Sequence, residues 1–260
     1  MATFTVNTTV DENDGVGVGD VSLRDAIAAA TAGDRIVFDA GVFTADGDEL
    51  NNTAVDLTLG ALLLTQGITI DGDVDGDGVA DVTIDGNGGS RLLDISNNVM
   101  GVSLESLTFA GANATGEGAA LRLRSGAEAT ILNSTFDGNI SAGRGGAIRA
   151  YSNSDLTIVN SAITNNTSAA GAIATTGYFT NIVNTTIAGN HATSATQGGG
   201  GIYALTNNLR VLNSTITGNR TEGDGGGIYG DGILTLVVDN SIIAGNSAGG
   251  AGDDVAQSVI

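Results

Sequence analysis

A run of aspartates between residues 73 and 81 has the spacing of a calcium-binding loop. Carboxylates stand at positions 1, 3, 5 and 9 of an EF-hand-like loop, with Gly78 at position 6 and a backbone carbonyl at position 7. Calcium takes about six to eight oxygen ligands, and clustered carboxylates repel one another unless a cation neutralises them. The sequence therefore predicts a Ca²⁺ site with the ligands Asp73, Asp75, Asp77, Val79 and Asp81.

The loop departs from the EF-hand pattern at position 12, where Ile84 replaces the bidentate Glu. In this respect it resembles the short calcium loops of dockerins and thrombospondins, in which the missing oxygen comes from elsewhere. Asp71 and Asp85 could supply that oxygen here. The alternative is a solvated acidic turn between two strands, predicted over 68–70 and 82–84.

A sequence repeat must position these side chains. Five segments share an apolar-x-Asn-x core, in which a second Asn follows the first by six residues. The first Asn recurs at intervals of 27, 24, 29 and 27 residues, and elements such as Gly145–Ile148 and Gly226–Ile228 lie between the copies. The first asparagines are Asn133, Asn160, Asn184, Asn213 and Asn240, and the second are Asn139, Asn166, Asn190, Asn219 and Asn246.

The repeat predicts an all-β parallel β-helix with coils of about 27 residues. Apolar residues alternate in each copy, as at Leu156, Ile158 and, after a turn, Ile163, which indicates short strands with one buried face. Asn tolerates the left-handed backbone of a turn, and stacked Asn side chains can bond to one another as a ladder. We therefore interpret both asparagines as structural, and the Asn-Ser-Thr triplets as part of the repeat rather than as glycosylation sites.

The first 56 residues predict a cap made of a strand, a helix, a second strand and an acidic loop that ends near Asn52. Ser22 and Asp25 form a capping-box pattern for an amphipathic helix over 22–32, and Gly33 supplies its stop. A strand follows at Arg35–Phe38. Residues 57–260 would then form roughly seven to eight coils.

Two stretches in this region resemble a known family. Val21-Ser-Leu-Arg-Asp-Ala-Ile27 and Ala32–Phe38 are similar to the N-terminal region of bacterial CSLREA-type proteins, with Val21 where that family has its Cys. The later repeats are also similar to those of polymorphic outer-membrane proteins, as at Phe136–Asn139. The resemblance implies a right-handed, secreted or surface-exposed β-helix, adhesin-like or uncharacterised, and it implies no enzyme activity.

The composition restricts the partners. The chain of 260 residues has 29 acids against 9 Arg and no Lys, a formal net charge of −20, which argues against nucleic acid and favours divalent cations. Residues 1–94 hold 18 of the acids and 3 of the Arg. No Cys is present, so disulfides are excluded. The apolar stretch Leu57–Leu64 is too short to span a membrane, so no membrane span is predicted.

One row of side chains could bind a polysaccharide or cell-surface glycan. The residue after each Gly-Gly-Ile element should point outward, which would place Arg122, Arg149, Ala174, Tyr203 and Tyr229 in register. Arg and Tyr along such a ridge could hold sugar through hydrogen bonds and ring stacking. The alternative is a set of ordinary amphipathic residues that cover a sheet.

We expect a calcium-stabilised, extracellular structural or adhesin-like module without catalytic residues. The alternative function is a pectate-lyase-like carbohydrate-active enzyme, which would need Asp with Arg, His or Tyr converging in one groove. His191 lies in a variable loop, where we expect surface decoration. No capping helix or polar stop is apparent after the last repeat, so we expect a longer chain, further domains or end-to-end self-association.

Overall fold

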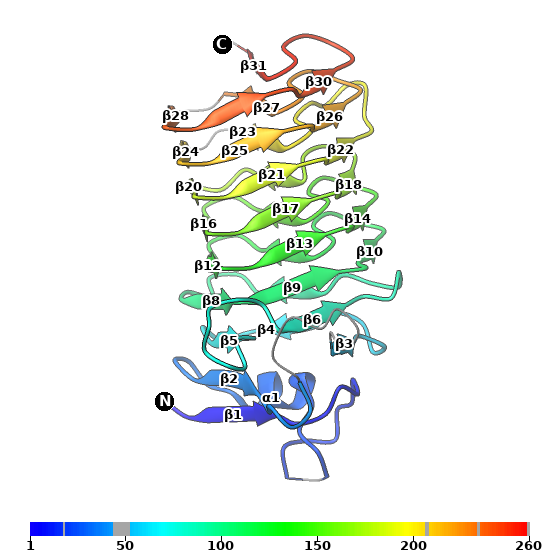
Figure 1. Ribbon diagram of the computed structural model, residues 1–260, viewed down its shortest axis with the longest axis vertical. Helices are drawn as coiled ribbons and strands as arrows, with labels where there is room; N and C mark the ends of the chain where they lie inside the picture. Colours follow the sequence, from blue (N-terminus) through cyan, green and yellow to red (C-terminus); the bar gives the residue numbers. More distant parts are fainter. Residues whose placement is uncertain (18, 44–52, 206–207, 233–234, 259–260) are drawn as a thin grey trace.

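The computed structural model describes residues 1–17, 19–43, 53–205, 208–232 and 235–258. The chain winds into an all-parallel β-solenoid of about seven turns, with its N-terminus at one end of the stack and its C-terminus at the other (Figure 1). Equivalent strands of successive coils pair in four sheets, here called A to D. The predicted parallel β-helix architecture is confirmed.

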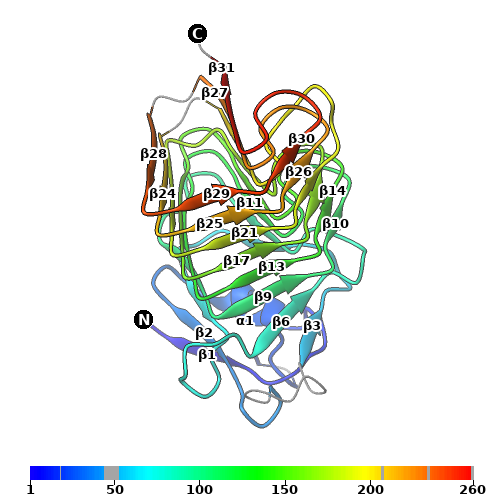
Figure 2. The same ribbon diagram turned by 45° about the horizontal axis from the view of Figure 1, so that its top comes forward.

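Sheets A and B follow each other along every coil and meet at a tight corner (Figure 2). The strands of sheet A are β1 (Thr3–Val6), β2 (Arg35–Phe38), β5 (Thr69–Asp71), β8 (Val102–Glu105), β12 (Glu128–Leu132), β16 (Asp155–Val159), β20 (Phe179–Val183), β24 (Asn208–Leu212) and β28 (Thr235–Asp239). The strands of sheet B are β3 (Ala54–Asp56), β6 (Val82–Asp85), β9 (Leu107–Ala110), β13 (Thr135–Asp137), β17 (Ala162–Thr164), β21 (Thr186–Ala188), β25 (Thr215–Thr217) and β29 (Ile242–Ala244).

The chain then passes through the short sheet D and returns along sheet C. Sheet D consists of β10 (Asn113–Ala114), β14 (Ile140–Ser141), β18 (Thr167–Ser168), β22 (His191–Ala192), β26 (Arg220–Thr221) and β30 (Ser247–Ala248). Sheet C consists of β4 (Leu62–Leu64), β7 (Leu93–Ile95), β11 (Leu121–Leu123), β15 (Ile148–Ala150), β19 (Ile173–Thr175), β23 (Ile202–Leu205), β27 (Ile228–Asp231) and β31 (Val255–Ser258).

Alternation along each strand builds the core as columns of like residues. Leu156 and Ile158 of β16 are buried while their neighbours are half-exposed, which is the predicted period of two. In sheet B the column includes Phe109 and Phe136, whose rings stack with centroids 4.6 Å apart. Aliphatic and aromatic side chains of equivalent residues therefore pack directly on one another from coil to coil.

The first asparagine of each repeat forms the corner between sheets A and B. All five have left-handed backbones, with φ between 46° and 52°, and Ser106 takes the same place in the preceding coil with φ 48°. Their exposed side chains bond from coil to coil, as from Asn184 Nδ2 to Asn160 Oδ1 at 2.8 Å. The predicted left-handed turn is present in all five copies. The outer ladder joins Asn133, Asn160 and Asn184, and separately Asn213 and Asn240.

The second asparagine forms a buried ladder. Asn190 Nδ2 donates to Asn219 Oδ1 at 2.8 Å, and Asn166 Nδ2 donates to Asn190 Oδ1 at 3.0 Å. Each Oδ1 also accepts the backbone N–H of the preceding Asn, and each Nδ2 donates to a core-strand carbonyl such as Ile163 O. Here the left-handed residue is the one before the Asn, for example Gly189 with φ 68°.

A third ladder follows the outer asparagines and was not predicted. The Ser or Thr after each one accepts the backbone N–H of its counterpart in the preceding coil, as Ser214 Oγ does from Thr185 N at 3.1 Å. Its own hydroxyl donates to the carbonyl two residues earlier. The ladder comprises Ser134, Ser161, Thr185, Ser214 and Ser241. The recurring Ser/Thr after Asn was its signal in the sequence.

The helix α1 (Leu23–Ala29) lies at the N-terminal end of the stack (Figure 1). Its predicted Ser22–Asp25 capping box is present, but the helix ends at Ala29 rather than at 32. Ala30 is already extended, and Asp34 Oδ2 accepts the backbone N–H of Thr31 at 2.9 Å in the turn that follows. Pairing of β1, β2 and β5 carries sheet A across the predicted boundary at residue 56. Most of the predicted acidic loop, 44–52, lies outside the described residues.

At the C-terminal end, an aspartate takes the place of a sixth ladder asparagine. Asp254 Oδ1 accepts from both the backbone N and Nδ2 of Asn246, at 3.1 and 3.0 Å. Asp254 therefore supplies the acceptor that an asparagine supplies in the other coils. Strands β28, β29 and β30 are edge strands within the described chain, and Val238 and Ile242 are exposed there.

Candidate functional site

The predicted calcium loop replaces one corner of the solenoid. The corner between sheets A and B that joins β5 to β6 consists of the ten residues Gly72–Asp81. In the next coil the same corner consists of Ser106 alone. The base of the loop is closed by a hydrogen bond from Asp81 N to Gly72 O at 3.2 Å. The loop is therefore an insertion held on two paired strands.

Asp73 organises the loop from within. Its two carboxylate oxygens accept the backbone N–H groups of Gly76 and Gly78, at 2.7 and 3.0 Å. Both glycines are left-handed, with φ 87° and 83°, which favours residues without a Cβ. The tight turn brings the acidic side chains together rather than spreading them into solvent.

Three of the predicted ligands converge. Asp73, Asp75 and Asp81 each offer a carboxylate oxygen, and these oxygens lie within 4.8 Å of one another. Oxygens that share one Ca²⁺ at about 2.3–2.6 Å can be at most about 5 Å apart, so this spacing fits the ion. Asp81 is buried and Asp75 is exposed, so the group opens to solvent on one side. Asp77 does not belong to this group, and its Oδ1 accepts from Val79 N at 2.7 Å.

The two supplementary acids have other partners. Asp71 forms a salt bridge with Arg35 through one oxygen and accepts Asp73 N through the other, at 3.1 Å. Asp85 lies at the far end of β6, where its Oδ1 accepts the backbone N–H of Asn87 at 2.6 Å. Neither joins the three converging carboxylates.

The electrostatics of Asp75 reflect this crowding. The hydrogen bond from Asp77 N alone would lower its pKa, but desolvation and the carboxylates of Asp77, Asp81 and Asp73 raise the pKa of Asp75 above its ordinary value. Repulsion between like charges is therefore present in the loop without a cation.

A second acidic group was not predicted. Carboxylate oxygens of Glu12, Asp14 and Asp25 also lie within 4.8 Å of one another beside α1. Desolvation, then the charges of Asp14, Asp25 and Asp20, raise the pKa of Glu12. The acidic run 11–20 was a signal in the sequence, but the capping box already accounted for Asp25, which bonds Ser22 and Gly15 N.

The predicted row on sheet C is in register. Arg122 pairs with Arg149, then come Ala174, Tyr203 and Tyr229 on successive coils. The row does not form a fully solvent-exposed ridge, because Arg149 is 4 % exposed and Tyr203 is 6 % exposed. Ala174 and Tyr203 form a second layer with Ala170 that is separate from the main core, and Tyr229 packs against it.

The connections between sheets D and C cover this second layer. The Tyr203 and Tyr229 rings stack with centroids 5.5 Å apart, and the Arg144 guanidinium lies 5.1 Å from the Tyr203 ring centroid. A Cβ on Gly198 would lie 2.7 Å from Tyr229 Cγ, so the loop can approach the ring only as glycine. The tyrosine end of the row therefore packs against the protein itself.

The arginine end of the row forms an ionic network. Asp94, which precedes Arg122 in the row, accepts from both Arg122 and Arg124, the latter at 2.9 and 2.8 Å. Burial alone would raise the pKa of Asp94, but these two guanidinium groups hold it at about 2. The Asp94 carboxylate is thus shared by the two guanidinium cations.

Arg149 and Glu117 form a second ion pair beside the Asp94 network. Arg149 Nε donates to Glu117 Oε2 at 2.8 Å, and the Arg149 guanidinium lies 4.4 Å from the centroid of the Tyr151 ring. Burial would raise the pKa of Glu117, but hydrogen bonds from Arg149 and Tyr151 lower it. Desolvation and the bond to Glu117 raise the pKa of the Tyr151 phenol.

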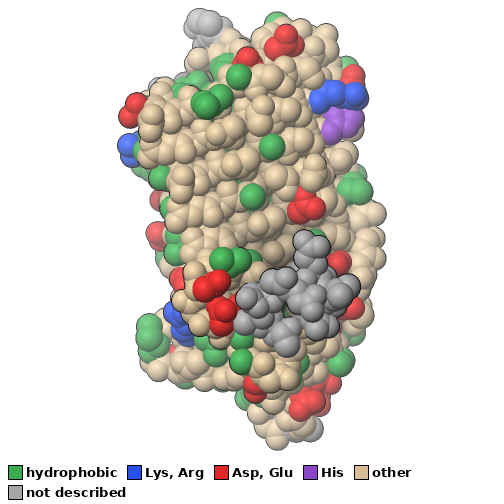
Figure 3. Space-filling model, in the orientation of Figure 1, with side chains coloured by type: hydrophobic (Ala, Val, Ile, Leu, Met, Phe, Trp, Pro, Cys, Tyr) green, Lys and Arg blue, Asp and Glu red, His purple; other side chains and the backbone are tan. Residues whose placement is uncertain are grey.

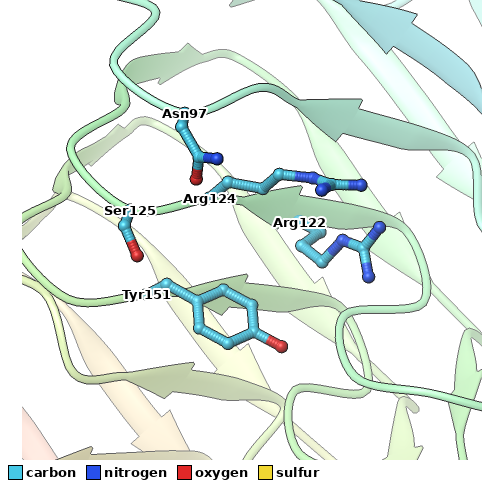
Figure 4. Close-up of a pocket in the computed structure, with 5 residues that line it drawn as sticks. All are labelled: Asn97, Arg122, Arg124, Ser125 and Tyr151. Carbon is cyan, nitrogen blue, oxygen red and sulfur yellow. The ribbon is translucent and has the colours of Figure 1, made fainter.

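These residues border a pocket of about 230 Å³ that the sequence did not predict (Figure 4). Three successive coils supply its lining, and the side chains of Arg122, Arg124 and Tyr151 extend in the same direction along the face. Asn97 and Ser125 border the opposite end. The full lining is Asn97, Arg122, Arg124, Ser125 and Tyr151.

His191 lies elsewhere, on β22. Its Nε2 is 3.3 Å from Glu222 Oε1 and 3.0 Å from Arg220 Nη2, in an exposed group that pairs Arg220 with Glu222. The expectation that His191 lies in a variable loop is wrong, because it pairs with Arg220 in sheet D.

The face over sheet B is nearly uncharged. Figure 3 shows that uncharged polar side chains and backbone cover most of the upper part of this face, whereas acidic side chains are more frequent toward the N-terminal end. Outward residues there include Thr135, Thr186 and Thr215, with Ala162 and Ile242 interrupting the row. A flat surface of this kind suits a scaffold.

Comparisons with known proteins agree with this architecture. No described helix is long and apolar enough to cross a membrane. No curated protein matches the sequence significantly. The family described as "Right handed beta helix region" matches residues 66–257, which is most of the chain and nearly all of its coils. The protein therefore belongs to the right-handed β-helix family.

Proposed function

We propose that this protein is an extracellular structural or adhesin-like module whose N-terminal coils are stabilised by Ca²⁺ bound in the loop at residues 72–81. The observation that carries the proposal is the convergence of Asp73, Asp75 and Asp81 within 4.8 Å. The resemblance to CSLREA-type and polymorphic outer-membrane proteins supports a surface location. The nearly uncharged face over sheet B and the ladders support a scaffold role.

In this proposal, calcium removes a local repulsion. The loop already has its fold from the hydrogen bonds of Asp73 and from Gly76 and Gly78, so little reordering opposes binding. The Asp75 carboxylate would then lie beside a divalent cation instead of beside three other acids. Calcium at millimolar concentration, as occurs outside cells, would saturate a site of modest affinity.

The test is calcium binding by titration calorimetry on the full chain, together with thermal unfolding in millimolar Ca²⁺ and in chelator at fixed ionic strength. We expect one site and a higher Tm with Ca²⁺. Asp75→Asn should lower the affinity at least tenfold. Asp239→Asn, which removes an exposed acid from a ladder coil, is the matched control and should change nothing. Equal Tm values in Ca²⁺ and in chelator would contradict the calcium proposal and would mean that the loop is a solvated acidic turn.

A carbohydrate-active enzyme is the second candidate, because Asp94, Arg122 and Tyr151 lie together on one face. The pKa values argue for binding rather than catalysis. That of Asp94 is about 2 and that of Tyr151 is raised, so neither exchanges protons readily near neutral pH. Release of reducing ends or unsaturated products from a panel of polysaccharides, abolished by Tyr151→Phe, would favour the enzyme. No product after prolonged incubation would favour the scaffold.

A further inference from the structure

The pocket on sheet C concentrates positive charge in an acidic protein. Arg91, Arg122, Arg124 and Arg149 are four of the 9 basic residues in a chain of net charge −20. Asp94 bonds Arg122 and Arg124, and Glu117 bonds Arg149. Arg91 lies close enough to Arg122, Arg124 and Asp94 to interact with them electrostatically. Four guanidinium groups against two carboxylates leave a local excess of positive charge.

Two of these guanidinium groups still have unused donors. Arg122 and Arg124 bond Asp94 through Nε and Nη2, and within the described chain the Nη1 group of neither has a hydrogen-bond partner. Asp94 fixes both guanidinium groups in orientation. An anion at the pocket would therefore meet donors that are already ordered, so little side-chain entropy would be lost on binding.

The other walls of the pocket suit a sugar ring rather than a bare ion. Tyr151 is half-buried and presents a ring whose position is set by Arg149, 4.4 Å from its centroid. Asn97 and Ser125 are exposed and add an amide and a hydroxyl at the opposite end. Aromatic rings accept the apolar face of a sugar, and amides and hydroxyls bond its hydroxyl groups.

The size and the overall charge limit the ligand. A volume of about 230 Å³ is below the roughly 300–1,000 Å³ of pockets for drug-sized ligands, so it matches one ring. The net charge of −20 would repel a long polyanion approaching from solvent. From these observations we propose that the pocket of Asn97, Arg122, Arg124, Ser125 and Tyr151 binds a single anionic sugar residue, one that carries a carboxylate or a sulfate.

This site goes beyond the proposed calcium-stabilised scaffold and does not depend on the calcium loop. Isothermal titration of the full chain with methyl β-glucuronide, glucose 6-sulfate, methyl β-glucoside and inorganic sulfate tests it. We expect at least one of the two anionic sugars to bind at least tenfold more tightly than the neutral glucoside and than inorganic sulfate. The stronger of the two anionic sugars identifies the charged group.

Two variants locate the binding. Arg124→Gln removes one ordered donor while Arg122 still holds Asp94, and Asn97→Asp adds a repelling charge on an exposed residue. Each should weaken binding of the anionic sugar at least tenfold. Asn97→Asp should leave Tm unchanged, whereas Arg124→Gln also removes one of the two cations that hold Asp94. Arg210→Gln, at an exposed position on sheet A, should leave it unchanged.

Four results would overturn the proposal, the first three of which concern selectivity and location. These three are equal affinity for the neutral glucoside, inorganic sulfate binding as tightly as the sugars, and undiminished binding by both Arg124→Gln and Asn97→Asp. Absence of binding by either anionic sugar at millimolar concentration would overturn it as well.

Discussion

The N-terminal coils and the ladder coils are linked to their neighbours by different kinds of side-chain interaction. From Asn133 to Asn246, the corners repeat with nearly constant length, and neutral amides and hydroxyls link every coil to the next. Residues 1–94 hold 18 acids, and their links are ionic, as between Arg24 and Asp11 or Arg35 and Asp71. A regular corner can use one amide side chain as both donor and acceptor, whereas an ionised carboxylate only accepts hydrogen bonds.

This difference makes the two regions respond to different conditions. An amide ladder carries no charge, so salt, calcium and mild acid should hardly affect it. On the proposed function, the converging carboxylates of Asp73, Asp75 and Asp81 should make the N-terminal coils sensitive to all three. The predictions below separate the regions on this basis.

The largest effect should come from the inner ladder. Asn190→Ala removes the acceptor of Asn166 N and Nδ2 and the donor to Ile163 O, all buried. Each buried polar group left without a partner costs about 1–3 kcal/mol, so we expect a loss of at least about 3 kcal/mol in the free energy of unfolding. Denaturant unfolding measures it. Asn184→Gly in the exposed outer ladder keeps the left-handed turn and should cost less than about 1 kcal/mol. Similar losses for both variants would break the distinction between the two ladders.

Calcium should have the next largest effect, confined to the N-terminal coils. At a free concentration of about 100 times Kd, a single site adds about 2.7 kcal/mol to the stability of the unit that binds it. Calcium should therefore raise the unfolding transition of the wild type but not that of Asp75→Asn. An equal rise in both proteins would place the binding elsewhere.

The hydroxyl ladder should contribute less. Ser214→Ala removes the acceptor of Thr185 N and leaves the adjacent Asn links intact, so we expect a loss of about 1 kcal/mol. Urea unfolding of the variant at neutral pH measures this. A Ser214→Thr variant keeps the hydroxyl and should recover most of the loss. A Ser214→Ala protein as stable as the wild type would mean that this ladder is incidental.

The acid response of the sheet C network should be confined to low pH. The folded pKa of Asp94 is about 2, below its unfolded value, so its contribution is present above that unfolded value and is lost as pH falls toward 2. Unfolding measured from pH 5 to pH 2 should therefore show a smaller pH dependence in Asp94→Asn than in the wild type. An unchanged slope would show that Arg122 and Arg124 do not stabilise the folded carboxylate.

The repeat allowed most of the coil structure to be predicted. The constant spacing of Asn133 and Asn139 predicted left-handed turns and Asn ladders, because each depends only on neighbours in register. It did not show that Asn133 itself is left-handed whereas Gly138 precedes Asn139 in that role. The Ser134 ladder was missed although a Ser or Thr recurs after each first Asn, because a hydroxyl beside a turn can equally bond its own backbone. Of the predicted calcium ligands, Asp73, Asp75 and Asp81 do converge, but Asp77 turns to its own loop backbone.

Features that depend on packing between layers could not be read from the repeat. Alternation of apolar residues predicts that Arg149 and Tyr203 lie on the outer side of sheet C. It does not predict that Gly-rich loops cover these side chains. The pocket combines Asn97, Arg124 and Tyr151 from three coils, at positions offset from the repeat motif. Such combinations depend on loop lengths that differ from coil to coil.

Native-state hydrogen exchange with and without Ca²⁺ tests the central claim most directly, because it reports the two regions separately. We predict that Ca²⁺ slows exchange of the backbone amides in Gly72–Asp81 and in the paired strands β5 and β6, while the amides of the ladder coils from Asn133 to Asn246 exchange at the same rates. Calcium-independent exchange in the loop, or equal slowing throughout the solenoid, would contradict the account.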